Sequence, residues 1–249
     1  MLLKVQIEVT NYCNFNCPDC YTHLAKRKKG FMDLSVFKAS LDLCNKLSIK
    51  ETWLHNWGEP LLHPRLMQMV GLANKNGFST GFTTNGYYLN THILQELKNN
   101  GLDFLDISIN AETSYNFGSF LKDIYFYSKT IGITTSFRVT VSNKEAYESA
   151  LSKTRGYAVK WQRLMLFDSN YERKNKCPVI NKLFVICWDG TIVPCCQVYD
   201  NQIVYGDIFI NHKILLNKIE SLYNDQDNST CKICREVDCD LPIIHKLEK

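Results

Sequence analysis

The cysteines of this chain are numerous and unevenly placed, and their distribution restricts the possible folds more than any other feature. Eleven of the 249 residues are cysteine: three at positions 13, 17 and 20, one at 44, and seven between 177 and 239. The chain begins with strand-like alternation and no signal peptide, so we expect a cytoplasmic protein, whose clustered cysteines bind metals or carry out redox chemistry. We therefore predict two metal sites separated by a scaffold.

The composition argues against two classes of partner. The formal net charge of +4 is too small to indicate nucleic acid, and no run of about 18 apolar residues is present to span a membrane. The one dense basic run, Lys26–Lys29, is most simply a solvated loop, and a patch for an anionic partner is the alternative.

Strand-like and helix-like segments alternate from residue 1 to about 165. The expected strands are 4–10, 51–57, 79–86, 102–110, 134–141 and 157–166, and the expected helices are 35–47, 64–77, 90–101, 115–132 and 144–154. Repeated strand–helix units imply parallel strands with right-handed crossovers. We predict an α/β fold in which residues 1–170 form a partial (β/α)6 TIM-like barrel and residues 171–249 form a small cysteine-rich module of a β-hairpin and a helix.

Local signals mark several helix ends. Ser35 and Asn90 are the expected N-caps, and Asn76-Gly77 and Gly101 are the expected C-terminal stops. Cys44 falls on the apolar face of the first expected helix, so we place it in the core.

Two of the expected strands carry polar side chains on one face. These are Asp106, Ser108 and Asn110 on one strand and Ser136, Arg138 and Thr140 on the next. If the apolar face packs on the helices, the polar face lines an interior built for a polar ligand. The alternative, an antiparallel sheet with one face in water, is disfavoured by the intervening helices. The motifs also follow strand ends, where barrel enzymes gather their chemistry.

The first cysteine group has the spacing Cys13-x3-Cys17-x2-Cys20, which supplies three thiolates from one loop. Structural zinc normally takes four ligands, and His23 is a candidate for the fourth. A [4Fe–4S] cluster held by three thiolates instead has one iron without a protein ligand, and an open coordination position is where a metal centre meets its substrate.

This C-x3-C-x2-C loop after the first strand, followed by Gly58-Glu59-Pro60, resembles the radical S-adenosylmethionine (SAM) superfamily over roughly residues 4–165. The resemblance implies that SAM binds the open iron and is cleaved to a 5′-deoxyadenosyl radical, which abstracts a hydrogen atom from a substrate. It implies that Cys13, Cys17 and Cys20 hold the cluster and that Gly58, Glu59 and Pro60 receive the methionyl ammonium. The residues that it assigns to the ribose or carboxylate are Asn85, Ser108, Asn110 and Arg138.

The sequence departs from the family pattern at two positions. The residue before the third cysteine is often aromatic, whereas here it is Asp19, and Phe15 or Tyr21 are the expected replacements. The residue before Gly58 is Trp57, where glycine is common.

The second cysteine group resembles a SPASM/Twitch auxiliary-cluster domain, and a zinc ribbon is the alternative. The Asp189-Gly190 turn predicts a hairpin over residues 184–196, and an expected helix over 212–223 precedes the later cysteine pair. The resemblance implies a second [4Fe–4S] cluster on Cys177, Cys195, Cys231 and Cys234, in the manner of the butirosin-pathway aminocyclitol dehydrogenase subgroup. For the remaining cysteines we expect core packing for Cys187, a spare ligand or surface thiol at Cys239, and either a buried neighbour or an active-site group at Cys196.

These features predict a radical SAM oxidoreductase with two [4Fe–4S] clusters and SAM as cofactors. The favoured reaction is the dehydrogenation of a small polyol, sugar or aminocyclitol, with the auxiliary cluster as electron acceptor and a flavodoxin- or ferredoxin-type protein as reductant. Glu8 and Arg163 are the candidate bases. A radical epimerase with Cys196 as hydrogen donor, and an enzyme that cross-links a ribosomal peptide, are the alternatives. An iron–sulfur electron carrier would need neither the Gly-Glu-Pro segment nor a polar interior.

Overall fold

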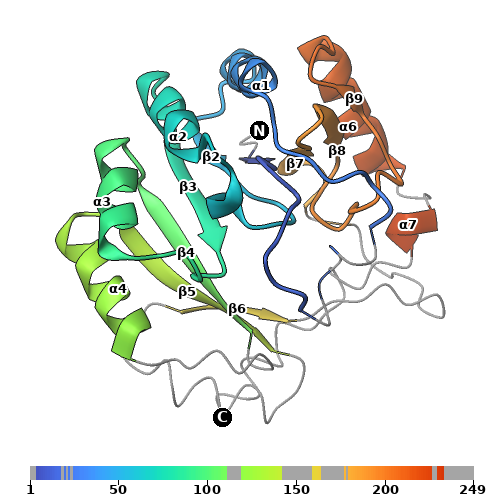
Figure 1. Ribbon diagram of the computed structural model, residues 1–249. Helices are drawn as coiled ribbons and strands as arrows, with labels where there is room; N and C mark the ends of the chain where they lie inside the picture. The colour runs from blue at the N-terminus through green and yellow to red at the C-terminus, as the bar shows by residue number, and fades with distance from the viewer. Residues whose placement is uncertain are drawn as a thin grey trace.

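A computed structural model describes residues 4–17, 20, 22, 25–110, 119–141, 159–163, 177, 179–225 and 229–232; for residues 109–110, 119–121, 139–141, 159–163 and 229–230 it describes the backbone alone. The elements form one mixed sheet with helices along one side (Figure 1). The strands are β1 (Lys4–Ile7), β2 (Glu51–Trp53), β3 (Ser79–Thr84), β4 (Phe104–Asn110), β5 (Thr134–Val141), β6 (Val159–Arg163), β7 (Leu183–Ile186), β8 (Thr191–Val193) and β9 (Gly206–Asp207). The helices are α1 (Leu34–Lys46), the 3₁₀ turn η2 (Pro60–Leu62), α2 (Leu66–Lys75), α3 (Thr91–Asn99), α4 (Ser119–Thr130), α6 (His212–Asn224) and α7 (Ser229–Lys232).

The sheet is open and has the strand order β6-β5-β4-β3-β2-β1-β7-β8-β9. Strands β1 to β6 pair in parallel in sequence order, which confirms the predicted α/β fold of repeated strand–helix units. Strands β1 and β2 are shorter than expected: they end at Ile7 and Trp53, and the loops described below follow.

The C-terminal hairpin continues this sheet. Strand β7 pairs in parallel with all four residues of β1, from Lys4↔Leu183 to Ile7↔Ile186, and β8 then returns antiparallel to β7. The hairpin predicted at Asp189-Gly190 is confirmed, with Gly190 at a φ of 89°. The division of the chain near residue 170 stays a prediction.

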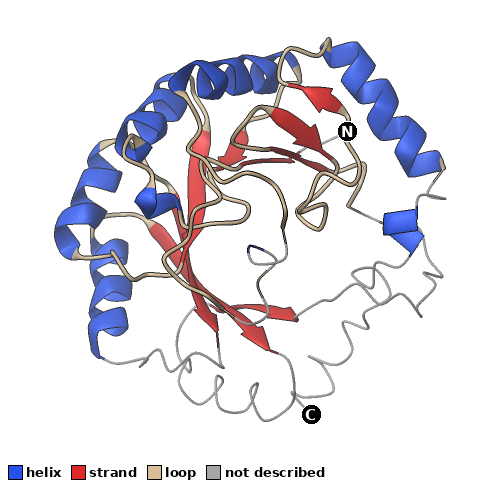
Figure 2. Cartoon of the chain, turned by 45° about the vertical axis from the view of Figure 1, so that its right-hand side comes forward, coloured by secondary structure: helices blue, strands red, loops and turns tan. Residues whose placement is uncertain are grey.

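The helices cover the apolar face of the parallel strands. Tyr125 of α4 stacks on Phe137 of β5 with ring centroids 5.3 Å apart, and Ile107 lies opposite Phe137 in the β4–β5 register. Because alternate residues of a strand point to opposite faces, Asp106 and Ser136 face away from the helices, as predicted. Figure 2 shows the helices along the outside of the arc formed by the sheet, with loops on its inner side.

The helix-end predictions were mostly confirmed. The Asn90 side chain accepts a hydrogen bond from the Ile93 amide, and Gly77 and Gly101 adopt φ of 78° and 91° after α2 and α3. The N-cap expected at Ser35 was wrong. Helix α1 instead begins at Leu34, directly after Asp33, whose backbone is extended. The Met32 amide bonds to the Val9 carbonyl oxygen, and this bond places the start of the helix one residue earlier than predicted. The helix expected over 144–154 lies outside the described residues.

The core lies between the sheet and helices α1 to α4. Phe37, Phe82, Leu94 and Phe137 are fully buried there, and so is Cys44, as predicted. Burial raises the pKa of the Cys44 thiol to about 12, so this cysteine stays a neutral packing residue. None of the described helices combines the length and the apolar character needed to cross a bilayer.

Replacement of Phe82 by alanine tests this core. Phe82 lies in the middle of β3 with no exposed surface, so Phe82→Ala is expected to lower the free energy of unfolding by about 3–5 kcal/mol. Urea denaturation followed by circular dichroism measures the change. The control is Phe209→Ala, which removes the same ring from a side chain that is 83% exposed and should change stability by less than about 0.5 kcal/mol. Equal losses in the two variants would contradict the assignment of the core.

Candidate active site

The loop that carries Cys13, Cys17 and Cys20 is closed at its base. Thr10 forms an antiparallel bridge with Phe31, and its hydroxyl donates to the Gly30 carbonyl oxygen at 2.7 Å. The Asn11 side chain adds two bonds, as donor to the Lys28 carbonyl and as acceptor from the Gly30 amide, each at 2.9 Å. These bonds fix the cysteine loop beyond the C-terminal end of β1.

Gly58 lets the loop after β2 lie directly against the cysteine loop. Gly58 has a φ of 110°, and a Cβ at this position would come within 2.5 Å of the Thr10 carbonyl oxygen and 2.8 Å of that of Tyr12. The next amide, that of Glu59, donates to the Tyr12 carbonyl oxygen at 2.7 Å. Only glycine combines this conformation with so close an approach.

The Glu59 carboxylate joins the ends of β2 and β3. It is 1% exposed and accepts hydrogen bonds from the Thr84 hydroxyl at 2.7 Å, the Asn85 amide at 2.7 Å and the Leu61 amide at 3.0 Å. Burial raises the pKa of Glu59, while these three bonds act in the opposite direction. The buried Glu59 side chain therefore holds the Gly-Glu-Pro segment and the end of β3 in fixed positions.

Asn85 brings the end of β3 to the cysteine loop. Its Nδ2 donates to Asn14 Oδ1 at 2.8 Å and lies 3.9 Å from Cys13 Sγ, while its Oδ1 accepts from the Tyr87 amide. The cysteine loop, the Gly-Glu-Pro segment and Asn85, which were predicted as one site, are thus in mutual contact. Asn14 was missed, because one asparagine in a loop carries no sequence signal.

The thiols of the cysteine loop have polar neighbours. Cys13 Sγ accepts from the Phe15 amide at 3.4 Å, and Cys20 Sγ lies 3.0 Å from the Thr22 hydroxyl. Burial raises the pKa of Cys13, and the charges of Glu59, Cys20 and Cys17 act in the same direction, against the Phe15 amide. In the described part of the chain, no three His, Cys, Asp or Glu side chains are placed to hold one metal ion. A [4Fe–4S] cluster bonds each thiolate to a different iron, so its ligands surround a volume instead of meeting at a point. His23, the candidate zinc ligand, lies outside the described residues.

The polar face of β4 and β5 forms the next part of the site. Asp106 accepts a hydrogen bond from Ser136 Oγ at 2.5 Å and pairs with Arg138 Nη2 at 3.0 Å. Ser108 lies opposite Arg138 in the register of the two strands. The side chain of Arg138 is 29% exposed, and the bond to Asp106 orients its guanidinium. The side chain of Asn110 is outside the described part.

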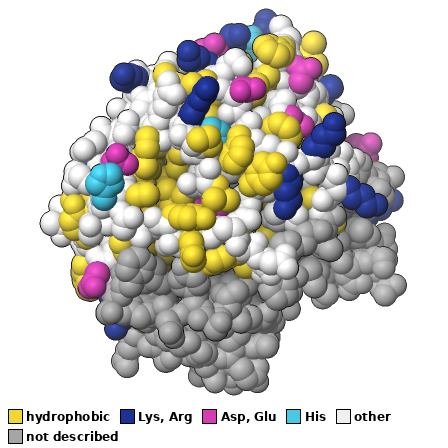
Figure 3. All heavy atoms as spheres, in the orientation of Figure 1, with side chains coloured by type: hydrophobic (Ala, Val, Ile, Leu, Met, Phe, Trp, Pro, Cys, Tyr) yellow, Lys and Arg dark blue, Asp and Glu magenta, His cyan; other side chains and the backbone are white. Residues whose placement is uncertain are grey.

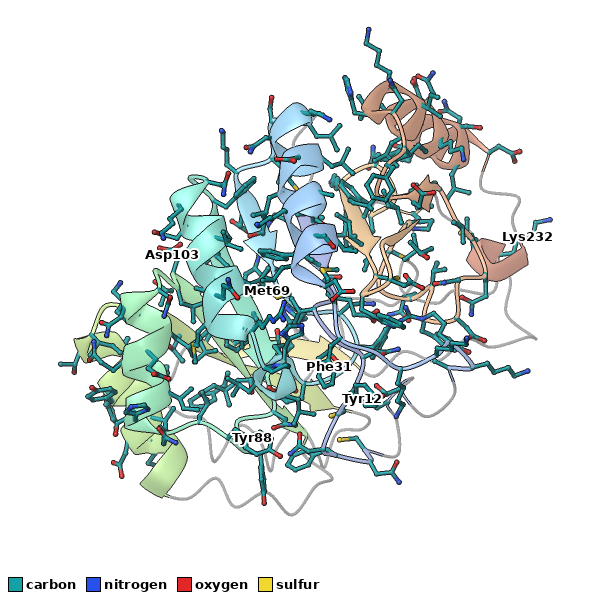
Figure 4. The ribbon with its side chains drawn as sticks, turned by 45° about the horizontal axis from the view of Figure 1, so that its top comes forward. Tyr12, Phe31, Met69, Tyr88, Asp103 and Lys232 are labelled. Atoms are coloured by element: carbon teal, nitrogen blue, oxygen red, sulfur yellow. The ribbon has the colours of Figure 1, made fainter. Side chains whose placement is uncertain are left out.

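Aromatic side chains surround the cysteine loop. Tyr12 packs on Phe31 with centroids 4.8 Å apart, and Phe15 meets Tyr87 edge-on at 5.8 Å. Figure 4 shows Tyr12, Phe31 and Tyr88 along this loop, and Figure 3 shows apolar side chains gathered on the same face. Phe15, one of the two aromatic replacements expected for Asp19, therefore lies at the site; Tyr21 and Asp19 are not described.

Three cysteines of the second group influence Tyr205 electrostatically. Cys177 is buried, Cys195 and Cys231 are half-buried, and the Tyr205 hydroxyl is buried with no hydrogen-bond partner among the described residues. Burial raises the pKa of Tyr205, and the charges of Cys195, Cys231 and Cys177 add to this effect. Cys234 and Cys239 lie outside the described residues. Cys187 packs with Val185, Val193 and Val198, which confirms its expected place in a core.

Trp57 connects the two cysteine groups. Its Nε1 donates a hydrogen bond to the carbonyl oxygen of Cys196 at 2.7 Å. Trp57, which stands where the family commonly has glycine, thus gives the Gly-Glu-Pro loop a direct hydrogen bond to the C-terminal hairpin.

Glu8, a candidate base, is the centre of a buried ion pair. Its carboxylate is fully buried and accepts two hydrogen bonds from the Arg27 guanidinium, at 2.7 and 2.9 Å, one from Asn56 Nδ2 and one from the Trp188 amide. This arrangement gives Glu8 a structural role. The side chain of Arg163, the other candidate base, is outside the described part.

The expectation of a solvated basic loop was wrong for Arg27. Lys26, Lys28 and Lys29 are exposed, but the Arg27 side chain is 7% exposed and also donates to the Tyr199 carbonyl oxygen. The amides of Lys26 and Arg27 both donate to Asp200 Oδ1, so this loop docks on the segment between β8 and β9.

Comparison with known proteins agrees with this geometry. The radical SAM superfamily profile matches residues 7–142, more than half of the chain. The chain is 35% identical over 106 residues to the tungsten-containing aldehyde ferredoxin oxidoreductase cofactor-modifying protein of Pyrococcus furiosus, a match that covers 42% of this chain and only 30% of that protein.

Two further relatives align over most of the chain. The S-adenosyl-L-methionine-dependent 2-deoxy-scyllo-inosamine dehydrogenase of Niallia circulans is 25% identical over 217 residues, covering 84% of this chain and 79% of that protein. The crystal structure of BtrN in complex with AdoMet and 2-DOIA superposes with a TM-score of 0.68 at 20% identity, covering 95% of this chain and 94% of that one. This likeness establishes a shared fold.

The close approach at Gly58 predicts the effect of adding one methyl group. Gly58→Ala would push the cysteine loop away from the Gly-Glu-Pro segment, so the variant is expected to lose most of its capacity to hold a cluster after anaerobic reconstitution. Iron content and visible absorbance of the purified protein measure this loss. Gly77→Ala is the matched control: Gly77 also has a positive φ, of 78°, but a Cβ there has no neighbour within 4 Å. A Gly58→Ala protein with the iron content of the wild type would contradict the prediction.

The ion pair predicts a second effect, on stability. Arg27→Met leaves the Glu8 carboxylate buried without its cation, so we expect a loss of about 3–5 kcal/mol in the free energy of unfolding of the cluster-free protein. The double variant Glu8→Gln/Arg27→Met should recover part of this loss, because it removes the unpaired charge. Lys28→Met, at an exposed neighbour, is the control, and urea denaturation compares all four proteins. A double variant no more stable than Arg27→Met would contradict this account.

Proposed function

This chain belongs to the radical SAM superfamily, and from that premise we propose that it dehydrogenates a small polyol, sugar or aminocyclitol, with a second [4Fe–4S] cluster as electron acceptor. Membership implies a radical SAM enzyme with one [4Fe–4S] cluster and SAM. When bound, these cofactors supply a 5′-deoxyadenosyl radical that removes a hydrogen atom from a substrate C–H bond.

Each part of the first site has a role in this proposal. Cys13, Cys17 and Cys20 ligate the SAM-binding cluster. Because the Glu59 carboxylate is engaged with three donors of its own scaffold, the main-chain carbonyls of the Gly58–Pro60 segment receive the methionyl ammonium. Arg138, held by Asp106, binds the SAM carboxylate through its exposed portion, and Ser108 and Asn110 bind the ribose.

The observation that supports the second cluster is that the charges of Cys177, Cys195 and Cys231 all act on one buried hydroxyl, that of Tyr205, which has no hydrogen-bond partner among the described residues. Cysteine thiolates are the usual ligands of a [4Fe–4S] cluster. Cys234 completes the proposed set.

The atoms and electrons of a dehydrogenation balance with SAM, a base and the two proposed clusters. The substrate would lose a hydrogen atom from its carbinol carbon and its hydroxyl proton to a base, and the remaining electron would pass to the auxiliary cluster that Cys177, Cys195, Cys231 and Cys234 would hold. The product is a carbonyl compound and 5′-deoxyadenosine. A flavodoxin- or ferredoxin-type protein supplies the electron that cleaves SAM.

The polar face at Asp106, Ser136 and Arg138 and the alignment with the Niallia circulans dehydrogenase over most of both chains support a small polyhydroxylated substrate. A radical epimerase with Cys196 as hydrogen donor is the second candidate. It is favoured by one observation, that the Trp57 bond fixes Cys196 beside the Gly-Glu-Pro loop.

The proposal is tested by loss of the auxiliary ligands. The reconstituted wild type should hold about eight iron atoms per chain, and Cys177→Ser/Cys195→Ser about four. With SAM and dithionite the double variant should still form 5′-deoxyadenosine but should not oxidise substrate, because its second electron has no acceptor.

Carbon-deuterated polyols, sugars and aminocyclitols identify the substrate by transfer of deuterium into 5′-deoxyadenosine. A wild type with about four iron atoms, or a double variant that still forms the carbonyl product, would refute the second cluster as acceptor. Cys196→Ala separates the two candidates: dehydrogenation survives this change, whereas epimerisation does not.

A further inference from the structure

Two aromatic side chains lie exposed beside the first cysteine loop (Figure 4). Tyr12 is 38% exposed and Phe31 is 42% exposed, and their rings pack on each other with centroids 4.8 Å apart. The Phe31 ring also meets the buried His63 ring edge-on at 5.5 Å, so the pair is packed against the protein while more than a third of each residue stays in water. Apolar surface left in water is unfavourable, and an exposed apolar patch often marks a contact with another molecule.

The main chain holds this aromatic pair in place next to the cysteines. Phe31 forms an antiparallel bridge with Thr10, and the Tyr12 carbonyl oxygen accepts a hydrogen bond from the Glu59 amide at 2.7 Å. Tyr12 directly precedes Cys13 in the sequence. An ordered apolar surface therefore lies one residue from a proposed ligand of the SAM-binding cluster.

Three basic residues accompany the aromatic pair. Lys28 and Lys29 belong to the segment that leads into Phe31, and the amide of Arg65 donates to His63 Nδ1 at 3.0 Å. All three basic side chains are exposed, and none of them forms an ion pair with another residue in the described part of the chain. Figure 3 shows Lys and Arg side chains at the edge of the apolar patch on this face. Their charge is therefore available to a partner.

The charge of this surface favours an acidic partner. Over residues 26–33 the exposed side chains carry three positive charges and one negative charge, that of Asp33. A partner of opposite charge would be steered to this face, and the aromatic pair would supply the apolar centre that protein interfaces favour. Complexes between electron-transfer proteins are small and transient, so such a partner needs only a small patch. Because electron transfer slows steeply with distance, a carrier that serves the cysteine loop must also bind close to it.

We propose that this surface is the docking site for the acidic one-electron carrier that reduces the SAM-binding cluster. It consists of Tyr12, Phe31, Lys28, Lys29 and Arg65. The inference rests on the proposed function, which supplies the flavodoxin- or ferredoxin-type reductant, and adds the place at which that reductant binds. The carrier is oxidised by one electron, which the cluster bound by the first cysteine loop would accept.

Charge reversal tests the docking site. The probe is oxidised flavodoxin, an acidic carrier, titrated into the reconstituted protein by isothermal titration calorimetry. Lys28→Glu/Lys29→Glu should raise the dissociation constant about tenfold, because two attractive positions become repulsive. The same variant should form 5′-deoxyadenosine from SAM and dithionite at the wild-type rate, since this small reductant needs no docking surface. A loss of that reaction would place the two lysines in the active site and overturn the inference.

Lys50→Glu/Lys75→Glu is the matched control. It changes the net charge by the same amount, but Lys50 and Lys75 are exposed just before β2 and β3, at the edge of the sheet opposite to the cysteine loop. At an ionic strength of about 0.1 M distant charges are screened, so its dissociation constant should stay within about twofold of the wild-type value. Wild-type affinity in Lys28→Glu/Lys29→Glu, or an equal loss in both double variants, would overturn the inference.

Cross-linking of the wild type locates the carrier directly, without any variant. Carbodiimide joins lysine amines to carboxylates in contact with them, and mass spectrometry should find Lys28 or Lys29 joined to flavodoxin. Cross-links from these lysines to a second copy of this chain, or none to flavodoxin, would overturn the inference. A protein that binds flavodoxin at these lysines but oxidises no polyol, sugar or aminocyclitol would refute the proposed reaction alone, so the two failures are distinguishable.

Discussion

The parallel pairing of β7 with β1 is the constraint on which the arrangement of this protein depends. The register from Lys4↔Leu183 to Ile7↔Ile186 makes both strands end at the same edge of the sheet. The first cysteine loop leaves from one of these ends, and the turn of the β7–β8 hairpin leaves from the other. Segments that are more than 150 residues apart in the sequence are therefore built on neighbouring strands.

The Glu8–Arg27 pair follows directly from that register. Glu8 is the first residue after β1, and its amide bonds to Ile186 at the end of β7, so its carboxylate enters the space between the two strand ends. Desolvating a carboxylate there is costly, and the two hydrogen bonds from Arg27 offset the cost only in one geometry. Because Arg27 belongs to the cysteine loop and also bonds to Tyr199, that geometry holds the loop against the segment between β8 and β9. The ion pair thus fixes the position of the cysteine loop relative to the ends of β1 and β7, whether or not it adds to the net stability of the fold.

Much of the scaffold could be predicted because its signals are local. Asn90 caps a helix with its own side chain, glycines stop two others, and the polar–apolar alternation of β4 and β5 assigns each residue to a face. The contact between the cysteine loop, Gly58 and Asn85 was also predictable, since parallel strands place their C-terminal ends along one edge. The error at Ser35 arose where a distant bond, from Met32 to Val9, overrode a local preference.

What the sequence could not reveal are partnerships between distant residues. Arg27 lies among lysines and carries the same charge, so the sequence does not distinguish it from them. Only the fold brings it to Glu8. Trp57 was recognised as unusual, but its bond to Cys196 crosses 139 positions. The Trp57 bond connects the Gly-Glu-Pro loop to the hairpin, and the Glu8 carboxylate that Arg27 binds also accepts from the Trp188 amide of the hairpin. This shared pattern gives a physical reason for the departure at Trp57: a glycine could not reach the hairpin, whereas an indole both reaches it and donates a hydrogen bond. The loop that contacts the first cysteine loop is thereby fixed relative to the hairpin, as the proposed transfer of an electron to an auxiliary cluster would require.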